Sequence, residues 1–220
     1  MQEIKRKIMK KMLTMYYKAN AGHIGSALSC LDILIDIYFN KMQDGDIFIL
    51  SKGHAAGALY CVLNAKGVIS DELLDTFYKD GTVMAAHPNA SIPGVLFATG
   101  SLGHGLSLAV GIAMANKKIN VYCLLGDGDC QEGQTYEALQ FILQHRPENL
   151  FVKLDLNGLQ GLGRVEDILT AVPFHNMLNY KPEPTVKGHG ISFMENKYEW
   201  HYWPMNKEQY EMAMKGVENA

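Results

Sequence analysis

A carboxylate stands in a glycine-rich turn between an apolar segment and a helical one, at Gly126-Asp127-Gly128. Glycines let a backbone bend sharply and approach a phosphate closely, and the N-terminus of the following helix presents amide donors to that phosphate. Because a carboxylate repels a phosphate unless a cation lies between them, Asp127 indicates Mg²⁺, which prefers oxygen ligands. Asn157 follows the next apolar segment, thirty residues further along. We therefore predict a magnesium and diphosphate site that contains Asp127 and Asn157.

The same residues have a simpler interpretation. Asp, Gly and Asn are ordinary turn formers, so residues 126–129 could be a tight turn and Asn157 a turn residue or a helix cap. Taken alone, each feature would favour that interpretation. The residues by themselves therefore leave both interpretations open.

Helical segments alternate along the chain with short, fully apolar segments that are typical of buried strands. This alternation predicts an α/β fold with a parallel sheet flanked by helices on both faces, in which ligands bind at the carboxyl ends of the strands. An amphipathic helix is expected through residues 4–16. The other expected helices are 26–39, 54–66, 105–117, 132–144 and 209–216, and the expected strands are 46–50, 119–125 and 150–156.

We expect a single domain over residues 1–220, because the chain is 48% hydrophobic and long enough to bury one core. Residues 158–190 are expected to be abbreviated and irregular, since Pro173, Pro182 and Pro184 interrupt any clear periodicity.

Composition argues against several classes of partner. The net charge of −3 is too small to indicate nucleic acid or a membrane surface. No apolar run approaches the ~20 residues needed to cross a bilayer, and the charged start lacks the apolar core of a signal peptide. A cytoplasmic protein is therefore expected. The four cysteines form no CxxC pair and are interpreted as reduced, buried thiols.

A series of motifs covering most of the chain resembles the transketolase family. The similarity is greatest to the split form, in which one chain carries the diphosphate-binding domain and a second chain carries the pyrimidine-binding and C-terminal domains. The motifs are, in order, GHIGSALS, SKGHAAGALY, AAHPN, ATGSLGHG, GDGDCQEGQTYEA, DLNGLQ and VKGHGISFMENKYEWH.

The resemblance implies a thiamine diphosphate-binding fold (the PP domain) that holds thiamine diphosphate and Mg²⁺. It assigns the metal to the side chains of Asp127 and Asn157 and to the backbone carbonyl of Leu159. The implied cofactor-binding residues are His54, Gly100, Ser101, Leu102, Gly126, Gly128, Asn157 and His201.

The resemblance also places four histidines around the reacting carbon, namely His23, His54, His87 and His201. There they would hydrogen-bond sugar hydroxyls and the developing oxyanion. A single histidine is more often structural, but four in matching motifs favour function. Glu132 and Glu137 match acids of a glutamate network across a dimer interface, although negative charge in the first turn of a helix is favourable in any case.

The implied activity is the transfer of a two-carbon ketol unit between sugar phosphates. The family's general acid is a glutamate of the pyrimidine-binding domain, and this sequence contains no such domain. A partner subunit, in a dimer of heterodimers, is therefore expected to supply that glutamate. Two alternatives remain open: another thiamine diphosphate enzyme of specialised sugar metabolism, such as one like deoxyxylulose phosphate synthase, and a non-catalytic cofactor-binding subunit.

The sequence departs from the family pattern near the site. The segment between Asn157 and VKGHG is short by a helix-strand-helix passage, so one strand should be absent and one sheet edge exposed. His104 replaces a glutamine, Ser101 replaces a proline, an expected aspartate near Leu162 is missing, and no glycine follows His201. These changes leave the sugar specificity open.

Overall fold

Three parallel strands form the central sheet, in the order β1-β2-β3. They are β1 (Ile47–Leu50), β2 (Val121–Gly126) and β3 (Leu150–Asp155). The structure is a computed structural model and describes residues 1–169 and 184–219. Leu50 pairs with Leu124 and Gly126 pairs with Asp155, so the three strands end together at one edge. The parallel sheet expected from the sequence is confirmed.

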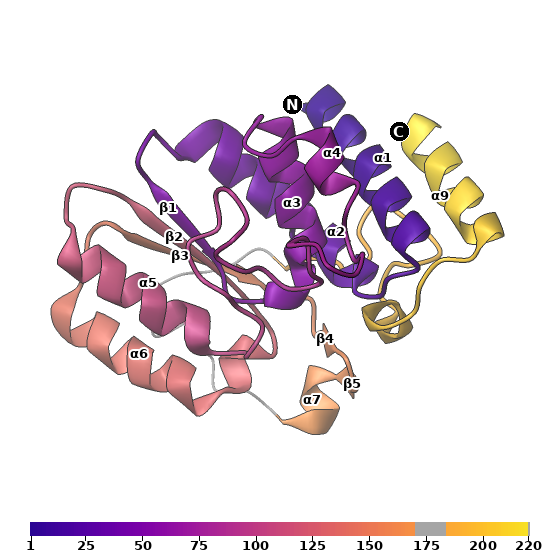
Figure 1. Cartoon of the computed structure of the whole chain (residues 1–220). Helices are drawn as coiled ribbons and strands as arrows, with labels where there is room; N and C mark the ends of the chain where they lie inside the picture. The colour runs from indigo at the N-terminus through magenta and orange to yellow at the C-terminus, as the bar shows by residue number, and fades with distance from the viewer. Residues whose placement is uncertain (170–183, 220) are drawn as a thin grey trace.

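Helices cover both faces of this sheet (Figure 1). One face carries α1 (Gln2–Ala19), α2 (Ile24–Asp36) and α3 (Ala56–Ala65), with α9 (Lys207–Asn219) packed against α1. The other face carries α5 (His104–Ala115) and α6 (Gly133–His145). Side chains of β2 alternate between the two cores. Tyr122 and Leu124 belong to the first core, whereas Val121, Cys123 and Leu125 belong to the second.

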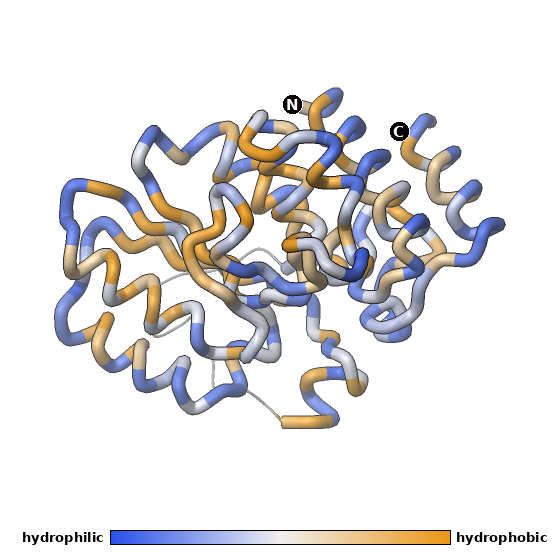
Figure 2. The backbone as a smooth tube through the Cα atoms, viewed as in Figure 1, coloured by the Kyte–Doolittle hydropathy of each residue, from blue (hydrophilic) through white to orange (hydrophobic). Residues whose placement is uncertain are grey.

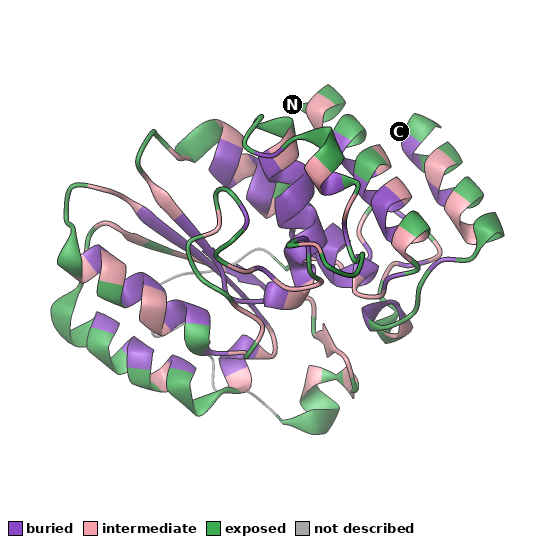
Figure 3. Ribbon diagram, viewed as in Figure 1, coloured by how far each residue is buried: buried purple, intermediate pink, exposed green. Residues whose placement is uncertain are grey.

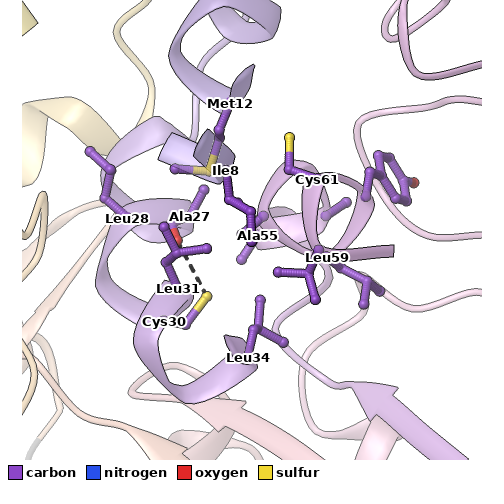
Figure 4. Close-up of a cluster of buried hydrophobic side chains, with 14 of the residues drawn as sticks. Ile8, Met12, Ala27, Leu28, Cys30, Leu31, Leu34, Ala55, Leu59 and Cys61 are labelled. Carbon is purple, nitrogen blue, oxygen red and sulfur yellow. Dashed lines mark hydrogen bonds between the residues drawn. The ribbon is translucent and has the colours of Figure 1, made fainter. Parts of the chain in front are cut away.

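The larger core packs α1, α2 and α3 together (Figure 4). Ile8 and Met12 of α1 meet Leu31 of α2 and Leu59 of α3, and all four are buried. Buried residues occupy the inner sides of these helices (Figure 3). Hydrophobic and hydrophilic residues alternate along α1 and α9 with the helical turns (Figure 2), as expected for helices with one buried side. The four cysteines are buried and unpaired, and Cys30 donates a hydrogen bond to the Ala27 carbonyl.

Shorter elements lie between the main helices and strands. They are the π-helical turn Ile37–Lys41, the 3-10 turns Gly53–Ala55, Asp129–Gln131 and Tyr198–His201, the helical turns α4 (Asp71–Leu74) and α7 (Val165–Ile168), and the strands β4 (Leu159–Gln160) and β5 (Gly163–Arg164).

The stretch expected to be irregular, residues 158–190, begins with the antiparallel pair β4-β5 and then α7. Pro173 and Pro182 lie outside the described residues. Where the description resumes, the Thr185 amide donates to the Leu156 carbonyl at 3.0 Å, so this segment runs beside the end of the edge strand β3.

Among residues 1–169 and 184–219, no helix has the length and apolar character required to cross a membrane.

Candidate functional site

A cavity of about 240 Å³ lies at the carboxyl ends of the three strands. Its walls come from the loops that follow β1, β2 and β3 and from the segments around Lys187 and His201. A wider hollow of about 380 Å³ lies between α2 and β3 but contains none of the predicted site residues. The predicted residues that line the smaller cavity are His54, Leu102, Gly126, Asp127, Gly128, Asn157, Leu159 and His201.

Asp127 lies directly against the loop that begins at Asn157. The Asn157 amide donates to its Oδ2 at 3.0 Å, and the Gly158 amide donates to its Oδ1 at 3.2 Å. The side-chain Oδ1 of Asn157 accepts from the Leu159 amide at 3.1 Å. Each of these acceptor oxygens keeps a further lone pair. Two loops thirty residues apart thus place carboxylate and amide oxygens together, as the sequence predicts, although their role as metal ligands remains a prediction.

Asp129 is a structural residue to which the sequence motifs assigned no role. Its buried carboxylate accepts hydrogen bonds from the Ser51 hydroxyl at 2.6 Å and from the Gly103 and Gly126 amides at 2.8 Å each. These partners belong to three different loops, so Asp129 holds them in one arrangement. Its neighbour Gly128 is closely covered, because a Cβ there would lie 2.8 Å from Cδ1 of Leu102. Burial raises the pKa of Asp129, whereas its hydrogen bonds oppose that shift.

Two buried lysines line the cavity, and the sequence motifs assigned them no role. Lys52 forms an ion pair with Asp155 and also donates to the Ser26 carbonyl at 3.1 Å. Burial disfavours the charge on Lys52, but attraction to Asp155 outweighs it and raises the pKa of the ammonium group. For Lys187, burial and the neighbouring Lys52 lower the pKa to about 8. The cavity therefore contains two cationic groups, of which Lys52 is neutralised by Asp155 and Lys187 forms no ion pair among the described residues.

Lys187 also orients His201. Its Nζ lies 3.1 Å from Nδ1 of His201 and donates to the Ser26 hydroxyl at 3.2 Å. Because an ammonium group only donates, Nδ1 of a neutral His201 must accept, and the ring proton then lies on Nε2. The contact thus selects one tautomer of His201.

The four predicted histidines converge. The ring of His23 lies 5.6 Å from that of His54, 5.9 Å from that of His87 and 5.1 Å from that of His201, and the His54 and His201 rings are 5.0 Å apart. His23 has a left-handed backbone, with φ 70°, which is uncommon outside glycine and is typical of functional sites. The Tyr60 hydroxyl donates to the His87 carbonyl at 3.1 Å and holds that loop in place.

All four imidazoles favour the neutral form. Burial lowers the pKa of His201 to about 3, with contributions from Lys187 and His23. Burial and His87 lower the pKa of His23 to about 4. The pKa values of His54 and His87 are also lowered, chiefly by burial. A neutral imidazole has one donor and one acceptor nitrogen, so this cluster can hydrogen-bond hydroxyl groups in both directions.

Several predicted residues do not line the cavity, namely His23, His87, Gly100, Ser101, Glu132 and Glu137. Gly100 packs beneath His87, since a Cβ at this position would lie 2.7 Å from Cδ2 of that ring. Ser101 is exposed. Glu132 is exposed at the N-terminus of α6, and Glu137 is exposed further along the same helix. The roles predicted for these residues are contacts with a cofactor and with a second subunit. Contacts within this chain do not test those roles.

The described residues contain no cluster of three or more His, Cys, Asp or Glu side chains that could bind a metal ion. The candidate magnesium ligands are of a different kind: one carboxylate, one side-chain amide and one backbone carbonyl. Such a set would need further oxygens from phosphate and water to complete an octahedron.

Residues 5–176 match the family model described as "Transketolase, thiamine diphosphate binding domain". The chain belongs to the transketolase family. This match establishes a thiamine diphosphate-binding domain and the corresponding α/β fold for the chain, in agreement with the motifs.

Relatives of similar length support the subunit interpretation. The chain is 37% identical to an apulose-4-phosphate transketolase subunit from Phocaeicola vulgatus, over 94% of this chain and 90% of the relative. It is 31% identical to "6-deoxy-6-sulfo-D-fructose transketolase subunit SqwG" of a Clostridium species, over 96% and 94%. The match thus identifies the N-terminal subunit of a split transketolase.

Single-chain transketolases extend well beyond this chain. The structure superposes on transketolase from Campylobacter jejuni with a TM-score of 0.89 and 26% identity, over 98% of this chain and 43% of that one. Human transketolase is 32% identical over 90% of this chain and 39% of its own length. The chain therefore corresponds to less than half of a single-chain transketolase.

The alignment with the Phocaeicola relative spans 253 positions, although this chain has 220 residues. The relative therefore contains residues that this chain lacks, in agreement with the expected shortening. The location of the shortening after Asn157 remains a prediction.

Proposed function

We propose that this chain is the diphosphate-binding subunit of a two-chain transketolase that uses thiamine diphosphate and Mg²⁺ to move a two-carbon ketol unit between sugars. The observation that carries the proposal is that Asp127, Asn157, His54 and His201 line one cavity, with His23 beside both of these histidines and His87 beside His23. Neither the metal site nor the histidine cluster would carry the proposal alone. A metal site does not indicate that a sugar is the substrate, and a histidine cluster does not indicate which cofactor is bound.

The residues present fit a magnesium diphosphate group. Asp127, Asn157 and the Leu159 carbonyl supply hard oxygen ligands from two adjacent loops. Gly126 and Gly128 line the same cavity, where a residue without a side chain lets a diphosphate approach the backbone. Lys187 adds positive charge to the same cavity, whereas the charge of Lys52 is balanced by Asp155. The cofactor would thus be held by its diphosphate end.

Thiamine diphosphate, when bound, supplies the carbon nucleophile that an amino-acid side chain cannot provide. The chain's own contribution is to orient and polarise. Neutral His23, His54 and His87 can donate to or accept from the hydroxyls of a ketose. His201, whose Nδ1 accepts from Lys187, has Nε2–H available to donate to an oxygen on which negative charge develops.

We further propose that a partner chain carries the pyrimidine-binding domain and its glutamate, and that two such heterodimers assemble. The relatives of similar length are named as subunits, and the chain spans less than half of single-chain transketolases; both facts support this proposal. The relatives' names point to phosphorylated and related sugars as substrates.

The test is to co-purify the chain with a pyrimidine-domain partner and to assay ketose donors and aldose acceptors with and without thiamine diphosphate and Mg²⁺. We expect transfer only when the partner and both cofactors are present. Asp127→Ala should weaken cofactor binding by about 100-fold or more, since losing even an outer contact of a metal site typically costs about 10–100-fold. Asp44→Ala, an exposed change before β1 at the opposite end of the sheet, is the matched control.

Full cofactor affinity in Asp127→Ala would contradict the metal assignment. Turnover by the chain without its partner would contradict the two-chain proposal. Cofactor binding without transfer to any sugar tested would favour the non-catalytic alternative.

A further inference from the structure

The aromatic residue that follows His201 is firmly seated beside the cavity. The Tyr202 amide donates to the Glu199 carbonyl at 3.1 Å, and the Trp203 amide donates to the same carbonyl at 3.0 Å. Gly22 packs against the Tyr202 backbone so closely that a Cβ on this glycine would lie 2.5 Å from the Tyr202 carbonyl oxygen. The backbone of Tyr202 thus has a defined position.

The Tyr202 ring spans the cavity from the histidines to the β4-β5 turn. It lies edge-on to His23, at 5.6 Å between ring centroids, and to His201, at 4.7 Å. At its far end, a Cβ added to Gly161 would lie 2.5 Å from the Tyr202 hydroxyl. The ring therefore fills the space between two walls of the cavity and limits its width.

The hydroxyl of Tyr202 is nevertheless available to a ligand. It has no hydrogen-bond partner among residues 1–169 and 184–219, and the residue is 58% exposed. By contrast, the Tyr60 hydroxyl is committed to backbone carbonyls of the neighbouring loop. A hydroxyl held by a packed ring but left unbonded can donate to and accept from a sugar hydroxyl at little cost in entropy.

The two lysines of the cavity are buried, whereas the exposed residues of its wall are uncharged. The lysines that line it, Lys52 and Lys187, are each 2% exposed and interact with buried partners. The exposed residues of the wall include Leu162, at 79%, and Tyr202. The outer wall thus presents an apolar surface and a neutral hydroxyl, which suit the polyol part of a sugar better than its phosphate.

We propose that Tyr202 is a specificity-determining residue of the ketol transfer. Its ring sets the width of the passage to His23 and His201, and its hydroxyl hydrogen-bonds a hydroxyl of an open-chain, polyhydroxylated sugar. This inference rests on the proposed function and refines it, because it adds Tyr202 to the histidines of this chain that recognise the sugar's hydroxyls.

The test uses the complex of this chain with its partner, loaded with thiamine diphosphate and Mg²⁺. Tyr202→Phe removes only the hydroxyl, and we expect it to lower kcat/KM for a ketose phosphate about 10-fold, the usual effect of one lost hydrogen bond. It should leave hydroxypyruvate unaffected, since that donor has no hydroxyl beyond its ketol unit. Tyr202→Ala should widen the passage. We therefore expect kcat/KM for long sugars to increase relative to kcat/KM for short sugars.

Tyr198→Phe is the matched control, because Tyr198 is exposed on the same turn but does not line the cavity. An equal loss for all donors in Tyr202→Phe, accompanied by weaker cofactor binding, would show a merely structural role and overturn the proposal. No change in any donor would overturn it as well.

Calorimetric titration of a ketose phosphate into the complex without thiamine diphosphate separates this inference from the proposed function. If the wild-type complex transfers no ketol unit, the proposed function fails. A ketose Kd raised about 10-fold by Tyr202→Phe would still support the sugar contact. A Kd unchanged by Tyr202→Phe, or no ketose binding at all, would overturn it.

Discussion

Lys52→Met should destabilise the fold strongly, because it leaves one buried charge without its partner. The side chains of Lys52 and Asp155 are 3% and 0% exposed. After the substitution, the hydrogen-bond donors left to the Asp155 carboxylate among the described residues would be the hydroxyls of Ser29, at 2.7 Å, and Thr185. Removing one member of a buried ion pair typically costs about 3–5 kcal/mol. For a chain of this size, we expect Tm to fall by roughly 6–20 °C.

The assay is urea unfolding followed by circular dichroism at pH 7, without cofactor. The double variant Lys52→Met/Asp155→Leu should recover much of the loss, since apolar replacements of both partners remove the uncompensated charge. Lys5→Met is the control, because Lys5 pairs with Asp32 near the surface and such pairs contribute about 0–1 kcal/mol. If Lys52→Met costs no more than Lys5→Met, the ion pair is not buried and the reasoning is refuted.

Three further predictions concern pH and two glycines. Because the pKa values of His23 and His201, about 4 and about 3, lie below the ordinary 6.5, the unfolded chain binds more protons than the folded one as pH falls below 6.5. Stability should therefore decrease from pH 6.5 towards pH 4, and urea midpoints should decrease less steeply for His201→Asn. Gly53→Ala should lower both Tm and cofactor affinity, because its Cβ would lie 2.7 Å from the Gly100 amide nitrogen and force two loops apart. Gly216→Ala should raise the free energy of unfolding by about 0.5–1 kcal/mol, since α9 has open space there and alanine favours helix.

Each of these has a contrary outcome. An identical pH dependence in His201→Asn and the wild type would show that this histidine does not couple protonation to folding. Unchanged Tm and cofactor affinity in Gly53→Ala would mean that the loops around residues 53 and 100 are not in close contact. A lower free energy of unfolding in Gly216→Ala would contradict the open space around Gly216. It would mean that the outer side of α9 contacts something other than solvent.

Local pattern was sufficient to predict the fold and the meeting of Asp127 with Asn157. Apolar segments of strand length alternate with amphipathic helices along the chain. A parallel sheet covered by helices on both faces is the arrangement that buries such strands, so the pattern predicts it. Residues that follow such strands must then lie at one edge, which is why two positions thirty residues apart could be paired from the sequence. The convergence of the four histidines was instead expected from family motifs, because no periodicity links these distant positions.

Only the tertiary structure revealed the pairing of Lys52 with Asp155 and the three hydrogen bonds of Asp129. One signal was present in the sequence: Asp155 ends a largely apolar strand, and a buried carboxylate requires a partner. The identity of that partner, 103 residues away, depends on the order of strands in the sheet and on how each loop folds back. The sequence likewise did not determine the position of Tyr202. Its ring lies over Gly161 because two separate turns pack together. The sequence thus determined which residues gather at the edge of the sheet, and the folded loops decided which of them contact one another.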